Sequence, residues 1–264
     1  MTSDRKRRYR PRVNAEERQK EILRLARDEG RVDVVTLATD FSVTTETIRR
    51  DLTVLERAGN LRRIYGGAVP VGRAPDPVLA VRDAVMTTEK ERIAKAALAE
   101  VPDEGSIVLD AGSTTSRMAE VLPSDRELTV IVNSPAIAMM LTPRANLTVI
   151  MLGGRVRRST FATVDEWLLQ PLSRMYVDVA FMAASGVSLE RGLTTPDPGE
   201  AAVKASMMTA ARRTVLLADH SKIENYSLAR FGSVSDLDVL ITDSGLEDSA
   251  AAALGLAGPR VVRA

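Results

Sequence analysis

Apolar residues follow two different patterns along the chain. In the first quarter they recur every three or four positions, as at Ile48, Leu52 and Leu55, which places them on one face of a helix. Further on they form short continuous runs separated by helical stretches, as in 107–109 and 128–132. Near-continuous apolar strands that alternate with helices are typical of a parallel sheet covered on both faces. The pattern therefore predicts a small helical domain followed by a larger α/β domain.

Three short helices are predicted before residue 60. Asn14 is the expected N-cap of the first, with Glu17 three residues later, and this helix runs to about Asp28. The second helix should bury four apolar side chains, those of Val35, Leu37, Ala38 and Phe41. The third follows after a tight turn, with Thr44 as its N-cap, because a hydroxyl there can accept from the free N–H groups of the first turn. Two short helices joined by a tight turn match a helix-turn-helix.

The outward faces of the third helix carry hydroxyls and arginines, namely Thr45, Thr47, Arg49 and Arg50. This arrangement suits a helix lying in a DNA groove, because arginine can donate two parallel hydrogen bonds to a guanine edge. An isolated pair of arginines on a helix is more often solvated surface. The segment 61–65 alternates like a strand and suits the wing of a winged helix, with Arg62 and Arg63 close to phosphates.

Two flanking segments bound this domain. Residues 2–12 hold six cations and one carboxylate, so segment 1–13 is expected to be either a basic arm that follows DNA phosphates or a solubilising tail. Residues 69–77 hold three prolines and one glycine, which predicts a linker. The winged helix-turn-helix should therefore span 14–68, and a second domain 78–264.

Composition narrows the functional classes. Residues 1–65 hold 16 Lys+Arg and 11 Asp+Glu, a net charge of +5, whereas the remaining residues hold 20 and 24, a net charge of −4. This asymmetry indicates that only the N-terminal part meets a polyanion. The absence of cysteine and the presence of a single histidine exclude disulfides, cysteine nucleophiles and all-histidine metal sites. Without a signal segment or a long apolar run, the expected location is the cytoplasm.

Polar residues directly follow the predicted strands of the second domain, where ligands of parallel sheets bind. They are Asp110, Gly112, Ser113, Thr114 and Thr115 after the first strand, Asn133 and Ser134 after the second, Gly153 and Gly154 after the third, Gly186 after the fourth, and Lys222 after the fifth. Segment 110–115 places three hydroxyls and free N–H groups at a helix N-terminus, which suits phosphate, although an ordinary hydroxyl cap is the alternative. No P-loop lysine and no G-x-G-x-x-G accompany it, so neither ATP nor NAD is favoured and no cofactor is expected.

Three further polar residues belong to the same region. Glu200 and Lys204 lie four apart on a predicted helix and can pair with each other, either at the site or as an ordinary surface pair. His220 is expected to be a loop residue beside the site rather than a catalyst.

The N-terminal motifs resemble those of a known family. Thr47-Ile48-Arg49-Arg50-Asp51-Leu52, set between the preceding helices and Tyr65-Gly66-Gly67-Ala68, is similar to the winged helix-turn-helix of DeoR-family transcription regulators. The family usually has histidine where this chain has Tyr65, which can still stack and hydrogen-bond a phosphate. The resemblance implies DNA binding by eight residues: Thr44, Thr45, Thr47, Arg49, Arg50, Arg62, Arg63 and Tyr65. A winged helix that binds protein is the alternative.

Residues 77–264 resemble the sensor domain of the same family, whose Rossmann-like fold is similar to that of sugar-phosphate isomerases of the ribose-5-phosphate isomerase type. The resemblance implies that Ser113, Thr114 and Thr115 hold a phosphate and Lys222 a sugar or phosphate oxygen. It places four residues at the sugar end: Asp110, Asn133, Glu200 and Lys204. Asp165 stands where the family commonly has glycine, and His220 replaces a serine.

An isomerase needs a carboxylate base near the reacting carbons. The isomerases carry an acidic cluster after the fourth strand, where this chain has Ala183-Ala184-Ser185-Gly186. We therefore expect no enzyme but a repressor of a carbohydrate catabolic operon. It would act as a homodimer or larger homo-oligomer on double-stranded operator DNA, and a phosphorylated sugar would release it. The alternatives are an isomerase-like enzyme with an appended DNA-binding domain and a structural nucleoid-type protein.

Overall fold

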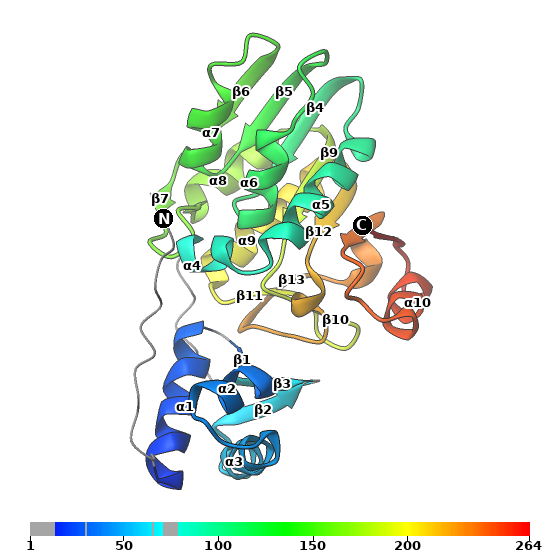
Figure 1. Cartoon of the computed structure of the whole chain (residues 1–264). Helices are drawn as coiled ribbons and strands as arrows, with labels where there is room; N and C mark the ends of the chain where they lie inside the picture. The colour runs from blue at the N-terminus through cyan, green and yellow to red at the C-terminus, as the bar shows by residue number, and fades with distance from the viewer. Residues whose placement is uncertain (1–13, 30, 65, 71–78) are drawn as a thin grey trace, which may run out of the picture. The chain divides into compact units, whose positions relative to one another are not determined.

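The chain forms two compact units, Met1–Pro77 and Val78–Ala264, which are treated separately below (Figure 1). The computed structural model describes residues 14–29, 31–64, 66–70 and 79–264. Among these residues, no helix is both long enough and apolar enough to cross a membrane. The basic segment 1–13, Tyr65 and most of the predicted linker lie outside the described residues.

The first unit has three helices and a small antiparallel sheet. Its elements are α1 (Ala15–Glu29), β1 (Val32–Asp33), α2 (Val34–Asp40), α3 (Thr45–Arg57), β2 (Leu61–Ile64) and β3 (Gly67–Pro70). The strands pair in the order β1-β3-β2. The predicted caps are confirmed, since Asn14 Oδ1 accepts from Glu17 N at 2.9 Å and Thr44 Oγ1 accepts from Thr47 N at 3.2 Å. This arrangement is a winged helix-turn-helix.

The core of this unit differs from the prediction at Val35 and in part at Phe41, which lies one residue past the end of α2 and is half-buried. Leu37 and Ala38 are buried as expected, but Val35 is 65% exposed. The reason is the start of α2: Asp33 accepts from Val35 N and Thr36 N, so the helix begins at Val34. The buried stripe then runs through Val34, Leu37 and Ala38 at helical spacing, and Val35 points away from it.

The wing extends further than the sequence indicated. Strand β3 continues to Pro70, two residues past the predicted end of the winged helix. Pro70 pairs with Leu61 of β2, whereas β1 reaches only Gly67 and Ala68. Proline is tolerated there because its missing N–H falls where β3 has a neighbour on one side only.

The second unit is built on a seven-stranded sheet in the order β15-β14-β12-β9-β4-β5-β6, and all its strand pairs are parallel. The strands are β4 (Glu104–Leu109), β5 (Glu127–Val132), β6 (Leu147–Met151), β9 (Val177–Ala183), β12 (Ala211–Leu217), β14 (Val239–Thr242) and β15 (Arg260–Arg263). The predicted strands 107–109 and 128–132 are confirmed, as parts of β4 and β5. The helices are α4 (Leu79–Ala84), α5 (Thr87–Ala97), α6 (Ser113–Glu120), α7 (Pro135–Leu141), α8 (Glu166–Leu172), α9 (Pro198–Ala210) and α10 (Asp248–Leu256).

Smaller elements complete this unit. They are the hairpin β7 (Arg155–Val156) and β8 (Thr163–Val164), a three-stranded antiparallel sheet of β10 (Gly186–Ser188), β11 (Gly192–Thr195) and β13 (Ala229–Gly232), and the 3₁₀ turns η1 (Leu98–Glu100), η2 (His220–Lys222) and η3 (Val234–Asp236).

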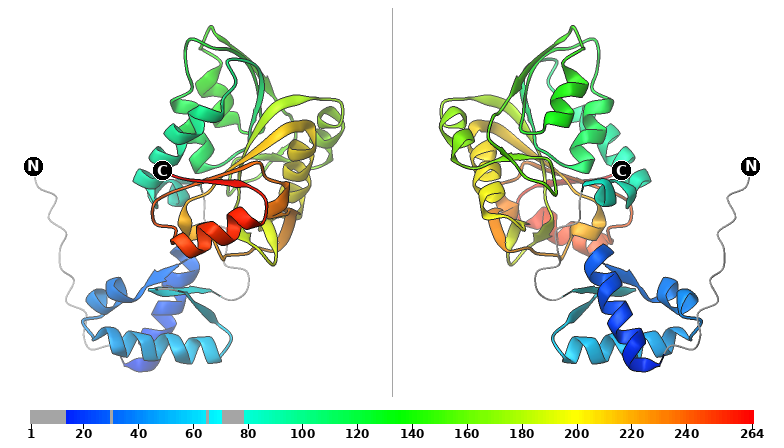
Figure 2. Two further views of the ribbon diagram at one scale, coloured as in Figure 1. Left: turned by 90° about the vertical axis from the view of Figure 1, so that its right-hand side faces the viewer. Right: turned by 90° about the vertical axis from the view of Figure 1, so that its left-hand side faces the viewer.

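Helices cover both faces of the large sheet (Figure 2). One buried cluster packs α5, α6 and α7 against the sheet, and Val215 and Leu217 of β12 point into it. The opposite cluster packs α8 and α9, and Leu216 points into that one. Burial on both faces explains the near-continuous apolar strands. Because the strands are parallel, the residues that follow β4, β9 and β12 meet at one edge of the sheet.

Candidate functional site

A pocket lies at the carboxyl ends of β4, β9 and β12, and α4, α5 and α9 close its sides. It is lined by Arg82, Lys90, Ala111, Gly112, Ser113, Thr114, Ala183, Ala184, Ser185, Glu200, Lys204, Leu217, Ala218, Asp219 and Lys222. The pocket therefore brings together six of the predicted effector residues: Gly112, Ser113, Thr114, Glu200, Lys204 and Lys222.

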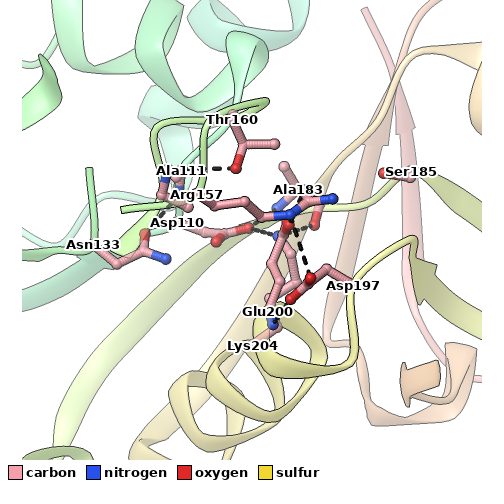
Figure 3. Close-up of polar contacts among 12 residues, drawn as sticks. Asp110, Ala111, Asn133, Arg157, Thr160, Ala183, Ser185, Asp197, Glu200 and Lys204 are labelled. Atoms are coloured by element: carbon pink, nitrogen blue, oxygen red, sulfur yellow. Dashed lines mark hydrogen bonds and ion pairs between the residues drawn. The ribbon is translucent and has the colours of Figure 1, made fainter. Parts of the chain in front are cut away.

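A buried charge network forms the floor of the pocket (Figure 3). The Lys204 ammonium is bonded to the Asp110 carboxylate and donates to Ala183 O at 2.9 Å, with Glu200 Oε1 at 3.5 Å. Glu200 also accepts from Arg157 Nη1 at 2.7 Å. Lys204, Asp110 and Glu200 are each at most 3% exposed, so Glu200 and Lys204 are not a surface pair. Such a network is stable only while each charge keeps its partner.

Asp110 has one carboxylate oxygen to spare. Its Oδ2 accepts from Lys204 and from Ala183 N at 3.0 Å. Its Oδ1 is buried and has no hydrogen-bond partner among the described residues. A buried acceptor without a partner is costly, and a hydroxyl group or water reaching it would remove that cost.

The other end of the pocket suits an anion. The N-cap of α6 is Gly112, which has no side chain to accept from the N–H groups of the first helical turn. A Cβ at Gly112 would lie 2.9 Å from Ala183 Cβ, so the close approach of this loop to β9 requires glycine. Ser113 and Thr114 line the pocket beside these N–H groups. Uncapped N–H groups at a helix N-terminus and neighbouring hydroxyls are the donors that phosphate prefers.

Three cations face this end. Arg82, Lys90 and Lys222 line the pocket, with Asp219 as the nearby carboxylate. Burial, together with repulsion from Lys222 and Arg82, lowers the pKa of Lys90 to about 8 against the attraction of Asp219. Cations crowded in this way give the pocket a positive potential that an anion would relieve.

Three predicted residues lie behind the pocket instead of lining it, and two of them hold the loop 110–115. The Thr115 hydroxyl is buried and donates to Gly112 O at 3.0 Å. Asn133 Oδ1 accepts from Ala111 N at 2.8 Å and ties the end of β5 to the loop after β4 (Figure 3). Ser134 caps α7 by accepting from Ile137 N at 3.4 Å.

The remaining predicted glycines lie elsewhere. Gly153 and Gly154 line a separate, shallow hollow with Arg155 and Trp167. Gly186 packs against the backbone of Asn225, where an added Cβ would lie 2.4 Å from a carbonyl oxygen. Its role is therefore close packing of β10.

Sequence analysis missed Arg82 and Lys90. Lys90 stands one helical turn before Ile93 and Ala94, so it occupies the inward stripe of α5, a signal that was available. Arg82 carries no comparable signal, because α4 has no buried stripe among its described side chains.

His220 sits beside the pocket loop as expected. Its Nδ1 lies 2.7 Å from Asp243 Oδ1, and its backbone N–H donates to Asp243 Oδ2 at 2.8 Å. It therefore holds the loop after β12 to the end of β14.

In the first unit, α3 presents Arg49 and Arg50 to solvent, with Thr45 and Thr47 half-buried beside them. A buried ion pair fixes the helix from behind: Arg18 Nε of α1 donates to Asp51 Oδ2 at 2.6 Å. The predicted arginines are thus exposed on a helix that a buried ion pair holds in place.

The wing is tied to the same helix. Arg63 N in β2 donates to Glu56 Oε1 at 2.9 Å, and Arg63 Nη1 donates to Thr53 Oγ1 at 3.4 Å. Arg62 is half-buried on the same strand. Arginines on the helix and on the wing are thereby held in one arrangement, as a DNA surface requires.

A winged helix with exposed arginines, joined in one chain to an α/β unit whose pocket is lined by cations, is typical of a DNA-binding transcription regulator with a sensor domain. Family comparison agrees: residues 18–73 match the DeoR-like helix-turn-helix domain, and residues 85–244 match the DeoR C terminal sensor domain. The chain belongs to the DeoR family of transcriptional regulators, so the predicted resemblance is confirmed.

Relatives of similar length are also regulators. The chain is 34% identical over 239 residues to the HTH-type regulator YulB of Bacillus subtilis, covering 90% of this chain and 92% of YulB. It is 34% identical over 247 residues to GlpR of Haloferax volcanii, covering 93% and 96%. The glycerol-3-phosphate regulon repressor of Escherichia coli is 29% identical over 223 residues, covering 84% and 88%.

Among solved structures, ribose 5-phosphate isomerase A of Methanocaldococcus jannaschii is similar over 52% of this chain and 55% of its own, at 21% identity and a TM-score of 0.40.

Proposed function

We propose that this regulator represses a carbohydrate catabolic operon and leaves its operator when a phosphorylated small molecule occupies the pocket at the strand ends. The carrying observation is the two-ended chemistry of that pocket. One end has the uncapped N-terminus of α6 with Lys90 and Lys222, and the other has the buried Asp110–Lys204–Glu200 network. A phosphate fits the first end, and hydroxyl groups fit the second.

The relatives support the class of ligand. One of them is named for glycerol 3-phosphate, a phosphorylated polyol, and the pocket here has matching chemistry. In this proposal Ser113, Thr114 and the α6 amides bind the phosphate, Lys222 binds a phosphate or sugar oxygen, and Asp110 Oδ1 accepts from a hydroxyl.

Binding without turnover is part of the proposal. The segment after β9 is Ala183-Ala184-Ser185-Gly186 and holds no carboxylate. Glu200 is engaged by Arg157, and Asp178 accepts from Ser106 N at 2.9 Å at the start of the strands. At the pocket, Asp110 is paired with Lys204, and Asp219 accepts from Ser221 N at 3.1 Å, so each of these carboxylates already has a partner.

For DNA, we propose that Thr44, Thr45, Thr47, Arg49, Arg50, Arg62, Arg63 and Tyr65 form the contact surface. A dimer or larger homo-oligomer, acting in the cytoplasm, would set one α3 in the major groove of each half-site. Light scattering coupled to gel filtration tests this assembly, and a monomer that binds operator DNA with full affinity would overturn it.

The ligand experiment uses thermal unfolding with a panel of phosphorylated sugars and polyols, each paired with its unphosphorylated counterpart. The proposal expects stabilisation by at least one phosphorylated compound, none by its counterpart, and loss of the effect in a Ser113→Ala, Thr114→Val variant. Product analysis of the same mixtures expects no isomer. Stabilisation that ignores the phosphate would refute the pocket assignment, and turnover would favour an isomerase-like enzyme.

A further inference from the structure

Helix α4 is held to the sensor unit by polar contacts. Leu79 N donates to Ser159 O at 2.7 Å, and the Asp83 carboxylate accepts from Arg117 Nη2 of α6 at 2.8 Å. No described side chain of α4 belongs to the buried apolar clusters of the unit. A helix of six residues has little stability of its own, so the polar contacts described here help to hold α4 in place.

Two of the contacts run directly to the pocket. Arg82 Nη2 donates to Ser185 Oγ at 3.0 Å, and both side chains line the pocket. The Lys90 ammonium, which is 2% exposed, donates to Arg82 O and to Val85 O at 2.6 Å, so it holds the last turn of α4 and the residue after it. These carbonyls account for two of the three ammonium hydrogens in the described contacts of Lys90.

Helix α4 is also the first described element after residues 71–78, which lead in sequence from the winged helix. A ligand that changes the order of α4 therefore acts at the point where the chain enters the sensor unit.

We propose that Arg82 is an effector-binding residue and that α4 is the element through which an anion in the pocket acts on the chain leading to the winged helix. This inference rests on the proposed function. A phosphate beside Ser113 and Thr114 would accept from Arg82 and from the third Lys90 hydrogen. A guanidinium has five N–H donors, so Arg82 can keep Ser185 and bind the anion together. An anion bound by both Arg82 and Lys90 would thus hold these two side chains in place and order α4.

The test measures amide hydrogen exchange of residues 79–86 in the full chain, with and without inorganic phosphate. The proposal expects exchange in this segment to slow by about tenfold when phosphate is bound. Arg82→Gln should weaken phosphate binding by about 10- to 100-fold, because a charge-assisted bond is lost, and should abolish the protection. Arg92→Gln, a matched change on the outer face of α5, should alter neither.

A second variant separates the helix from the pocket charge. Asp83→Asn removes the carboxylate that pairs with Arg117 and leaves the pocket cations in place. We expect phosphate binding within about threefold of the original, together with faster exchange of residues 79–86 without ligand. If protection by phosphate persists in Arg82→Gln, Arg82 is not an effector-binding residue. If phosphate binds the original chain but leaves exchange of residues 79–86 unchanged, α4 does not respond to the anion. Either result overturns this inference and leaves the proposed function standing. A chain that binds neither phosphate nor any phosphorylated compound would overturn the proposed function itself.

Discussion

Replacing Lys204 by methionine tests the buried network of the sensor unit. Methionine fills a similar volume, so the change mainly removes the charge. The Asp110 carboxylate, 0% exposed, would then keep Ala183 N as its one remaining donor. Glu200 would still be paired with Arg157, so Asp110 carries most of the loss.

Removal of one partner from a buried ion pair costs about 3–5 kcal/mol, and we expect that loss for Lys204→Met. For a unit of this size, 1 kcal/mol corresponds to about 2–4 °C in Tm, so the melting temperature should fall by about 10 °C. The exposed Lys95, changed in the same way, should shift stability by less than about 0.5 kcal/mol.

The assay is urea unfolding followed by tryptophan fluorescence. Trp167 is the one tryptophan of the chain and lies in the sensor unit. Its fluorescence therefore reports the unfolding of the sensor unit and not that of the winged helix. The double variant Asp110→Asn, Lys204→Met should recover most of the loss, because it leaves no isolated charge. A loss below about 1 kcal/mol for the single variant, or a double variant less stable than the single one, would refute this reasoning.

Three other predictions follow from single contacts. Asp51→Asn should destabilise the winged helix by about 3 kcal/mol in circular dichroism melts, because it strips the buried Arg18 of its counter-charge; a neutral result would contradict the bracing of α3. Asp165 has φ 86° and ψ −178°, a backbone region that strongly favours glycine. Asp165→Gly should therefore raise the free energy of unfolding by about 1 kcal/mol in urea unfolding, although it loses the exposed ion pair with Arg155. A destabilised variant would show that the ion pair outweighs the backbone strain. The pKa of Lys90 is about 8, so phosphate affinity should fall as pH rises above 8, where the free protein loses the ammonium that the anion needs; a flat titration would exclude Lys90 from binding.

The layout of the fold was predictable because the relevant signals are local. Apolar runs such as Ile107–Leu109 mark strands buried on both faces, and the hydroxyl after Val43 marks the start of α3. The position of the pocket at one edge of the sheet was predictable because ligands bind beyond the carboxyl ends of parallel strands.

What escaped prediction depends on helix phase and on packing between distant segments. Thr115 lies one residue beyond Thr114 on α6, and that rotation turns its hydroxyl back onto Gly112 O. Val35 is exposed because the buried stripe of α2 runs through Val34, Leu37 and Ala38. Arg82 reaches the pocket only because α4 packs beside strand ends that follow it in sequence, which no local pattern encodes.

The central claim is that a phosphorylated ligand at the α6 N-terminus weakens DNA binding by the winged helix. Fluorescence anisotropy tests it most directly, with a DNA fragment selected by the protein from a random pool, titrated in the presence and absence of the compound that stabilises the sensor unit. The account predicts that DNA affinity falls by about 5- to 150-fold with the ligand and that the Ser113→Ala, Thr114→Val variant binds the DNA equally with and without it. Equal DNA affinity of the original chain with and without saturating ligand would contradict the account.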